Sequence, residues 1–261
     1  MIHDPENRSS LETSLTAHWL ALAFVLLFPM ATTFLYFVVL SGDDSMSLVY
    51  GAGKVLQFAF PLVWVFAVQR KVRILAKNVS KPGLLRLLPR PQLKPIVWGA
   101  GFGLLVVVAT LAVYYGYFKQ SEYLGKTPEL ITAKFQDMGL TTPGRFFIFA
   151  GFLALPHSLL EEYYWRWFAF GQLRRVTPMP WAIAISSLGF MAHHVIVIHQ
   201  FLQGPIALTL LFSLCVAVGG AVWAWLYQRH GSLYGPWASH FLVDCVIMYL
   251  GYDLVQWSAL S

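Results

Sequence analysis

Apolar residues in this chain gather in long, nearly unbroken stretches that short polar connections separate. A helix that crosses the hydrocarbon core of a bilayer needs about 20 mostly apolar residues. Stretches of this length predict seven spanning helices, at 17–40, 47–69, 96–118, 144–168, 179–200, 205–228 and 236–257. The connection after the third helix, or the segment after Arg175, has room for one short extra helix. We therefore predict an all-α, polytopic integral membrane helix bundle with seven to eight transmembrane helices.

The composition supports a membrane protein and argues against a nucleic-acid-binding protein. Of the 261 residues, 57% are hydrophobic and only 11% are charged, whereas a soluble domain carries about 25% charged residues. Aromatic side chains make up 16%, in keeping with their preference for the two water interfaces of a bilayer. The net charge of +6 is concentrated in one connection, so we expect no nucleic-acid partner. Cys215 and Cys245 lie inside apolar stretches and are expected to be free, buried thiols.

The distribution of charge among the connections predicts the orientation of the chain. The connection at 70–94 contains eight lysines and arginines and no acid, whereas the connection at 41–47 contains two aspartates and no base. Because lysine and arginine are retained on the cytoplasmic side, we expect 70–94 to be a basic cytoplasmic loop and the amino terminus to be cytoplasmic. On the outer side, residues 127–140 have the pattern of a short amphipathic helix, with Thr127 as N-cap and Pro128 in the first turn.

Charged side chains inside an apolar stretch are costly, so each one is a candidate functional residue. Glu162 precedes Arg166 by four residues, which places both on one face of a helix in the favourable order for an ion pair. Glu161 points about 100° away, toward His157, and has no arginine at the right spacing. An unpaired, buried carboxylate is suited to act as a general base; the alternative is a charge cluster that only holds helices together. We assign no role to Lys54, in the second stretch.

Histidines on two later stretches complete the set of candidate site residues. Phe190 and His194 are four apart and are expected to stack, while the adjacent His193 turns to a neighbouring face. His240 and Asp244 are also four apart, so the carboxylate could orient the ring, either in a catalytic site or in a purely structural hydrogen bond. All of these groups fall in the middle or the cytoplasmic half of their stretches. They could therefore meet in one site inside the bundle, toward the cytoplasm.

Three motifs in this order resemble the signature of the CAAX protease and bacteriocin-processing family (CPBP, or Abi) of glutamic intramembrane proteases. The family motif EExxxR appears as EEYYWR at 161–166, FxxxH as FMAHH at 190–194, and HxxxN as HFLVD at 240–244. Asp244 stands where better-known members carry Asn. The resemblance extends from about residue 144 to the end. We accordingly divide one integrated membrane domain into N-terminal helices at 1–143 and a CPBP catalytic core at 144–261.

The resemblance implies a hydrolase that cleaves a peptide bond without a metal or other cofactor. In this reading Glu161 activates water, His194 is its partner, His240 stabilises the oxyanion and Asp244 orients His240. The expected supporting residues are Glu162, Arg166, Phe190 and His193. Whether His193 or His194 is the catalytic histidine stays open, as does the protonation state of Asp244. The expected partners are the lipid bilayer and a protein or peptide substrate at the membrane, prenylated or otherwise processed.

Two other functions fit the same residues. Glu161, His194, His240 and Asp244 could form the ligand set of a metal-dependent membrane protease, although no HExxH motif is present. The protein could also be a non-proteolytic membrane scaffold or an immunity-type factor.

Overall fold

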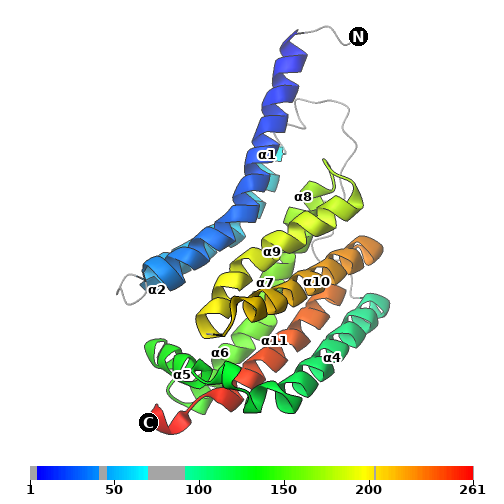
Figure 1. Cartoon of the computed structure of the whole chain (residues 1–261). Helices are drawn as coiled ribbons and strands as arrows, with labels where there is room; N and C mark the ends of the chain where they lie inside the picture. The colour runs from blue at the N-terminus through cyan, green and yellow to red at the C-terminus, as the bar shows by residue number, and fades with distance from the viewer. Residues whose placement is uncertain (1–4, 41–45, 70–91, 203, 261) are drawn as a thin grey trace.

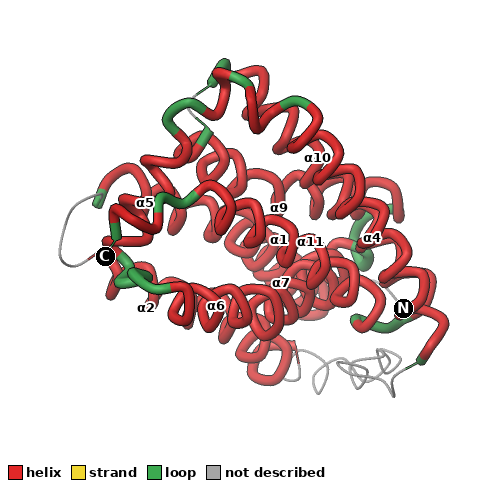
Figure 2. The backbone as a smooth tube through the Cα atoms, turned by 90° about the horizontal axis from the view of Figure 1, so that it is seen from below, coloured by secondary structure: helices red, strands yellow, loops and turns green. Residues whose placement is uncertain are grey.

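The fold is an all-α bundle, as predicted. A computed structural model describes residues 5–40, 46–69, 92–202 and 204–260, and in these ranges the chain forms helices joined by short loops, with no strand (Figure 1, Figure 2). The main helices are α1 (Pro5–Phe34), α2 (Met46–Val63), α4 (Leu93–Gly116), α5 (Thr127–Asp137), α6 (Pro143–Phe152), α7 (Ser158–Glu162), α8 (Gly171–Leu173), α9 (Met179–Phe201), α10 (Ile206–His230) and α11 (Tyr234–Leu254). The π-helical segments are η1 (Leu35–Val39), η2 (Trp64–Gln69), η5 (Leu153–His157) and η6 (Tyr163–Phe170), and the 3-10 turns are η3 (Phe118–Gln120), η4 (Glu122–Leu124) and η7 (Trp257–Ala259).

The described residues contain six helices long and apolar enough to cross a membrane, not seven to eight as we predicted. They span Thr16–Val39, Ser47–Val68, Leu93–Gln120, Pro143–Leu173, Met179–Phe201 and Ile206–His230. The predicted seventh span corresponds to α11, which is long enough but carries His240, Asp244 and Asp253, whose polarity lowers its hydropathy. The protein is therefore a multi-pass integral membrane protein, and α11 is less apolar than its six spanning helices.

Several smaller predictions can be compared with the structure. The predicted amphipathic helix is α5, but its N-cap is Lys126 rather than Thr127, because the Thr127 hydroxyl donates instead to the carbonyl of Phe201 at 2.9 Å. Cys215 and Cys245 are free, as expected, although their side chains lie on the surface of the bundle. Residues 70–91 and 41–45 lie outside the described residues, so the basic loop and the orientation of the chain stay predictions.

Helices α4 and α11 pack closely side by side, and glycine makes this possible (Figure 1). A Cβ atom at Gly99 would lie 1.9 Å from the carbonyl oxygen of Gly235, and one at Gly103 would lie 3.0 Å from the Cα of Ser239. Small residues spaced four apart let two helix backbones approach in a membrane. This contact fixes the position of α11 and therefore of His240, which follows Gly235 by five residues.

The continuous helical segment 143–173 forms the centre of the bundle, and π-helical turns interrupt it twice. The short helix α7 lies between η5 and η6, and every side chain of η6 is buried. Pro156 lies inside η5, where the carbonyl of Leu155 accepts a hydrogen bond from the indole of Trp237 at 3.0 Å. Each π-helical turn changes the direction in which later side chains point, and such turns are frequent at functional sites. Here they flank Glu161 and Glu162.

Candidate active site

The predicted ion pair between Glu162 and Arg166 is present and completely buried. Arg166 Nε lies 3.1 Å from Glu162 Oε2. The guanidinium carbon lies 4.7 Å from the ring centroid of Phe190 and 5.0 Å from that of Trp223, so two aromatic faces also stabilise the positive charge. Since arginine keeps its proton in proteins, this contact balances the negative charge of Glu162 inside the bundle.

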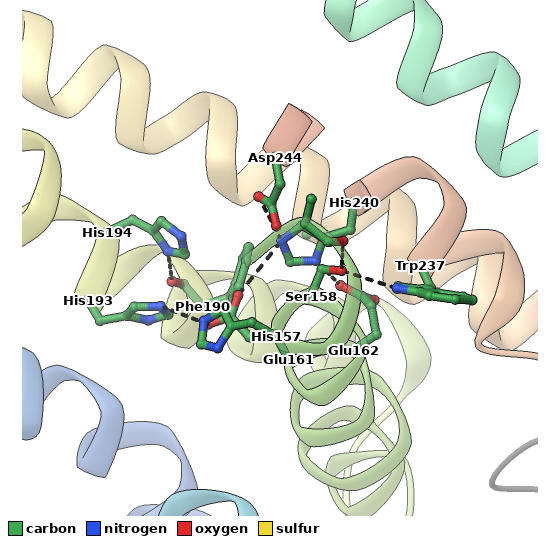
Figure 3. Close-up of polar contacts among 12 residues, drawn as sticks. His157, Ser158, Glu161, Glu162, Phe190, His193, His194, Trp237, His240 and Asp244 are labelled. Atoms are coloured by element: carbon green, nitrogen blue, oxygen red, sulfur yellow. Dashed lines mark hydrogen bonds and ion pairs between the residues drawn. The ribbon is translucent and has the colours of Figure 1, made fainter. Parts of the chain in front are cut away.

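His240 also binds to Glu162, which the sequence did not predict. Its Nδ1 lies 2.8 Å from Glu162 Oε1 (Figure 3). Its ring stacks on that of Trp223, with centroids 4.4 Å apart. We expected Asp244 to orient this ring, but Asp244 Oδ1 lies 3.5 Å from Nε2, beyond the usual range of a hydrogen bond. The shorter contact therefore comes from Glu162, which fixes the ring and leaves Nε2 facing the centre of the site.

The Glu161 carboxylate is surrounded by three histidines (Figure 3). Its Oε1 lies 3.6 Å from His157 Nε2 and 3.7 Å from His193 Nε2, and its Oε2 lies 3.7 Å from His240 Nε2. The side chain is buried, and no arginine or lysine lies within 4 Å of it among the described residues. These separations are too long for direct hydrogen bonds and match polar groups that share a bridging molecule. Glu161 is thus the buried carboxylate without a strong partner that the helical spacing predicted.

The two adjacent histidines of α9 have different surroundings. His193 lies against Glu161 and stacks on Trp165, with the two rings nearly parallel and their centroids 5.9 Å apart. His194 turns away: its Nδ1 lies 2.8 Å from the carbonyl oxygen of Phe190, and its ring contacts the Phe190 ring edge-on instead of stacking on it as we expected. His194 occupies the motif position, yet His193 is the histidine that the structure brings to the carboxylate.

His157 and Asp244 lie at the more open side of the site. The His157 side chain is 21% exposed and that of Asp244 is 23% exposed, compared with 6% for Glu161. Within the described ranges, no three histidine, cysteine, aspartate or glutamate side chains are grouped so that they could hold a metal ion.

The segment that carries this site matches a known protein family. The model of the Rce1-like family, described as type II CAAX prenyl endopeptidase Rce1-like, matches residues 143–246. This segment belongs to the Rce1-like family. It begins at α6, ends within α11 and contains all eight site residues predicted from the sequence, whereas α1, α2 and α4 lie outside it. No curated protein and no solved structure matches the chain. The Rce1-like match indicates a peptidase, and the six apolar helices place it in the membrane.

Proposed function

We propose that this protein is a glutamic intramembrane endopeptidase in which Glu161 activates the attacking water. One observation carries the proposal: a buried carboxylate faces three imidazoles at 3.6–3.7 Å, while the adjacent carboxylate of Glu162 is already neutralised by Arg166. A base needs a free lone pair and a suitable environment. Of the two adjacent glutamates, Glu161 meets both requirements.

In the proposed reaction, water lies between Glu161 and the scissile carbonyl. Glu161 accepts a proton as the water oxygen bonds to the carbonyl carbon, and the carbonyl oxygen becomes an oxyanion. The proton then moves to the amide nitrogen as the carbon–nitrogen bond breaks, which gives a carboxylic acid and an amine. His193, in contact with Glu161 Oε1, is suited to hold this water and to pass the proton on.

His240 is the proposed donor to the oxyanion. Its Nδ1 is engaged by Glu162, so the opposite nitrogen, Nε2, is available on the side of Glu161. A donor that the protein holds in place before the reaction stabilises developing charge without reorganisation. We propose that Glu162 orients the ring and that Asp244, near Nε2, stabilises positive charge on it. In this proposal His194 only packs against Phe190.

The proposed substrate is a CAAX-type or other processed protein at the membrane, because the matched family is described by this activity. The test compares purified wild-type protein with Glu161→Gln on a farnesylated peptide that ends in a C-a-a-X sequence, followed by mass spectrometry. Glu129→Gln is the control, since Glu129 is an exposed glutamate of α5. We expect cleavage by the wild type and by Glu129→Gln, and at least a 1000-fold loss in Glu161→Gln. Undiminished cleavage by Glu161→Gln would refute the proposed base.

A further inference from the structure

Lys54 of α2 lies beside the site although α2 is outside the Rce1-like segment. Its Nζ lies 5.4 Å from the ring centroid of Tyr50 and 5.7 Å from that of Phe58. The side chain is partly buried, and within the described part of the chain its ammonium has no carboxylate within 4 Å and forms no hydrogen bond. Contacts with aromatic faces stabilise the charge but leave the three N–H donors unused.

Phe58 connects Lys54 to the catalytic groups. The Phe58 ring packs edge-on against His157 with centroids 5.9 Å apart, and His157 in turn lies 3.6 Å from Glu161. The hydroxyl of Tyr163, next to the two glutamates, donates to the Phe58 carbonyl at 3.3 Å. Lys54 also interacts electrostatically with Glu161 and with His193. The Lys54 ammonium therefore lies close enough to affect the charged groups of the site electrostatically, yet no carboxylate of the site contacts it directly.

An ammonium in an apolar helix without a direct counter-ion is expensive and marks a functional position. Glu161 does not compensate it directly, because the groups that contact this carboxylate are the imidazoles of His157, His193 and His240. The unused donors of Lys54 are thus available to an anion that arrives with a ligand. The aromatic rings of Tyr50 and Phe58 limit the directions from which such an anion can approach.

We propose that Lys54 binds the free terminal carboxylate of the substrate and so sets the position of the bond that Glu161 cleaves. This inference rests on the proposed function. A C-a-a-X sequence ends its chain, so a bond cleaved within it lies no more than about 10 Å of extended peptide from the terminal carboxylate. Internal peptide segments lack this carboxylate and bind the site less well.

The test measures binding without cleavage, in the Glu161→Gln background and in nanodiscs. The probes are two fluorescent farnesylated C-a-a-X peptides of one sequence, one with a terminal carboxylate and one with a carboxamide. We expect the carboxylate peptide to bind at least tenfold more tightly. Lys54→Met should abolish this preference by weakening the carboxylate peptide alone, by about tenfold to a hundredfold, and Lys54→Arg should retain most of it.

The matched control is Lys134→Met, because the Lys134 ammonium also lies over two aromatic rings, 4.3 Å from Tyr36 and 5.5 Å from Phe37. This variant should keep the full preference. Equal affinity for the two peptides in the parent, no binding of either, or an unchanged preference in Lys54→Met would each overturn the inference.

A lipid phosphate is the other anion that Lys54 could bind, and the nanodisc lipid distinguishes it. Phosphatidylcholine discs are compared with discs that contain phosphatidylglycerol. A Lys54-dependent effect of phosphatidylglycerol without any preference for the terminal carboxylate would overturn the inference. The proposed function is tested separately, by measuring cleavage in the wild type and its loss in Glu161→Gln.

Discussion

Gly99→Ala adds a single methyl group on α4 and should lower the activity of the site, although Gly99 is not one of the site residues. An alanine Cβ there would lie 1.9 Å from the carbonyl oxygen of Gly235, whereas ordinary contacts begin at 3.4 Å. The obstacle is backbone, so α4 and α11 must separate by about 1.5 Å. His240 follows Gly235 on α11 and would move with it, away from the Glu162 oxygen at 2.8 Å. A misplacement of about 1 Å in a catalytic group costs about 100-fold in rate, and overpacking costs about 1–3 kcal/mol of stability.

Gly101→Ala is the matched control, because a Cβ at Gly101 meets nothing within 4 Å on the same helix. The same substitution there should stabilise α4 by up to about 1 kcal/mol through helix propensity alone. The assay combines kcat for the farnesylated peptide with Tm in detergent. Gly99→Ala should lose about 100-fold in kcat and have a lower Tm than Gly101→Ala. If the two variants matched in both measurements, the contact between α4 and α11 would not position His240.

Three further predictions concern buried polar groups. Glu162→Gln should lower the free energy of unfolding by about 3–5 kcal/mol, because it leaves the buried guanidinium of Arg166 without its counter-ion; a denaturant titration that gave less than 1 kcal/mol would contradict this. His193→Gln should reduce kcat at least 100-fold while His194→Gln keeps it within tenfold, and the reverse order would assign the catalytic role to the motif position. Gln57→Leu should raise Tm and increase the free energy of unfolding by roughly 1–3 kcal/mol, because both amide atoms of this fully buried side chain lack a partner among the described residues. A lower Tm would show that the amide is satisfied.

Contacts within one helix were predictable from the sequence. The ion pair of Glu162 with Arg166 and the ring contact of Phe190 with His194 both join residues four apart, although that ring contact is edge-on and not stacked. At 3.6 residues per turn this spacing places two side chains on one face whatever else the fold does. The helical class and six of the spans follow equally from local hydropathy, because a membrane leaves backbone groups few other partners.

Contacts between helices were not predictable in this way. Glu162 and His240 are 78 positions apart, and no spacing rule relates them. The choice between His193 and His194 depends on how α9 is rotated about its axis, since successive residues differ by about 100°. That rotation is fixed by tertiary packing, visible in the parallel stacking of His193 on Trp165. Trp165 itself lies in a π-helical segment, whose altered turn the hydrophobic pattern does not reveal.

The adjacent glutamates show why residues outside the matched segment belong to the proposed mechanism. Glu162 can orient His240 only while α11 keeps its position, and α11 is positioned by the glycine contact with α4, which the family match does not include. We propose that Glu161 stays free to act as a base because Arg166 and the Nδ1 of His240 engage Glu162, while the His240 Nε2 lies 3.7 Å from Glu161, beyond hydrogen-bond distance. In the proposed mechanism, one carboxylate therefore organises the site while its neighbour reacts. A change that moved α11 would disrupt the orientation of His240 by Glu162 before it affected Glu161 as a base. The rate would then fall while Glu161 kept its contacts with His157 and His193.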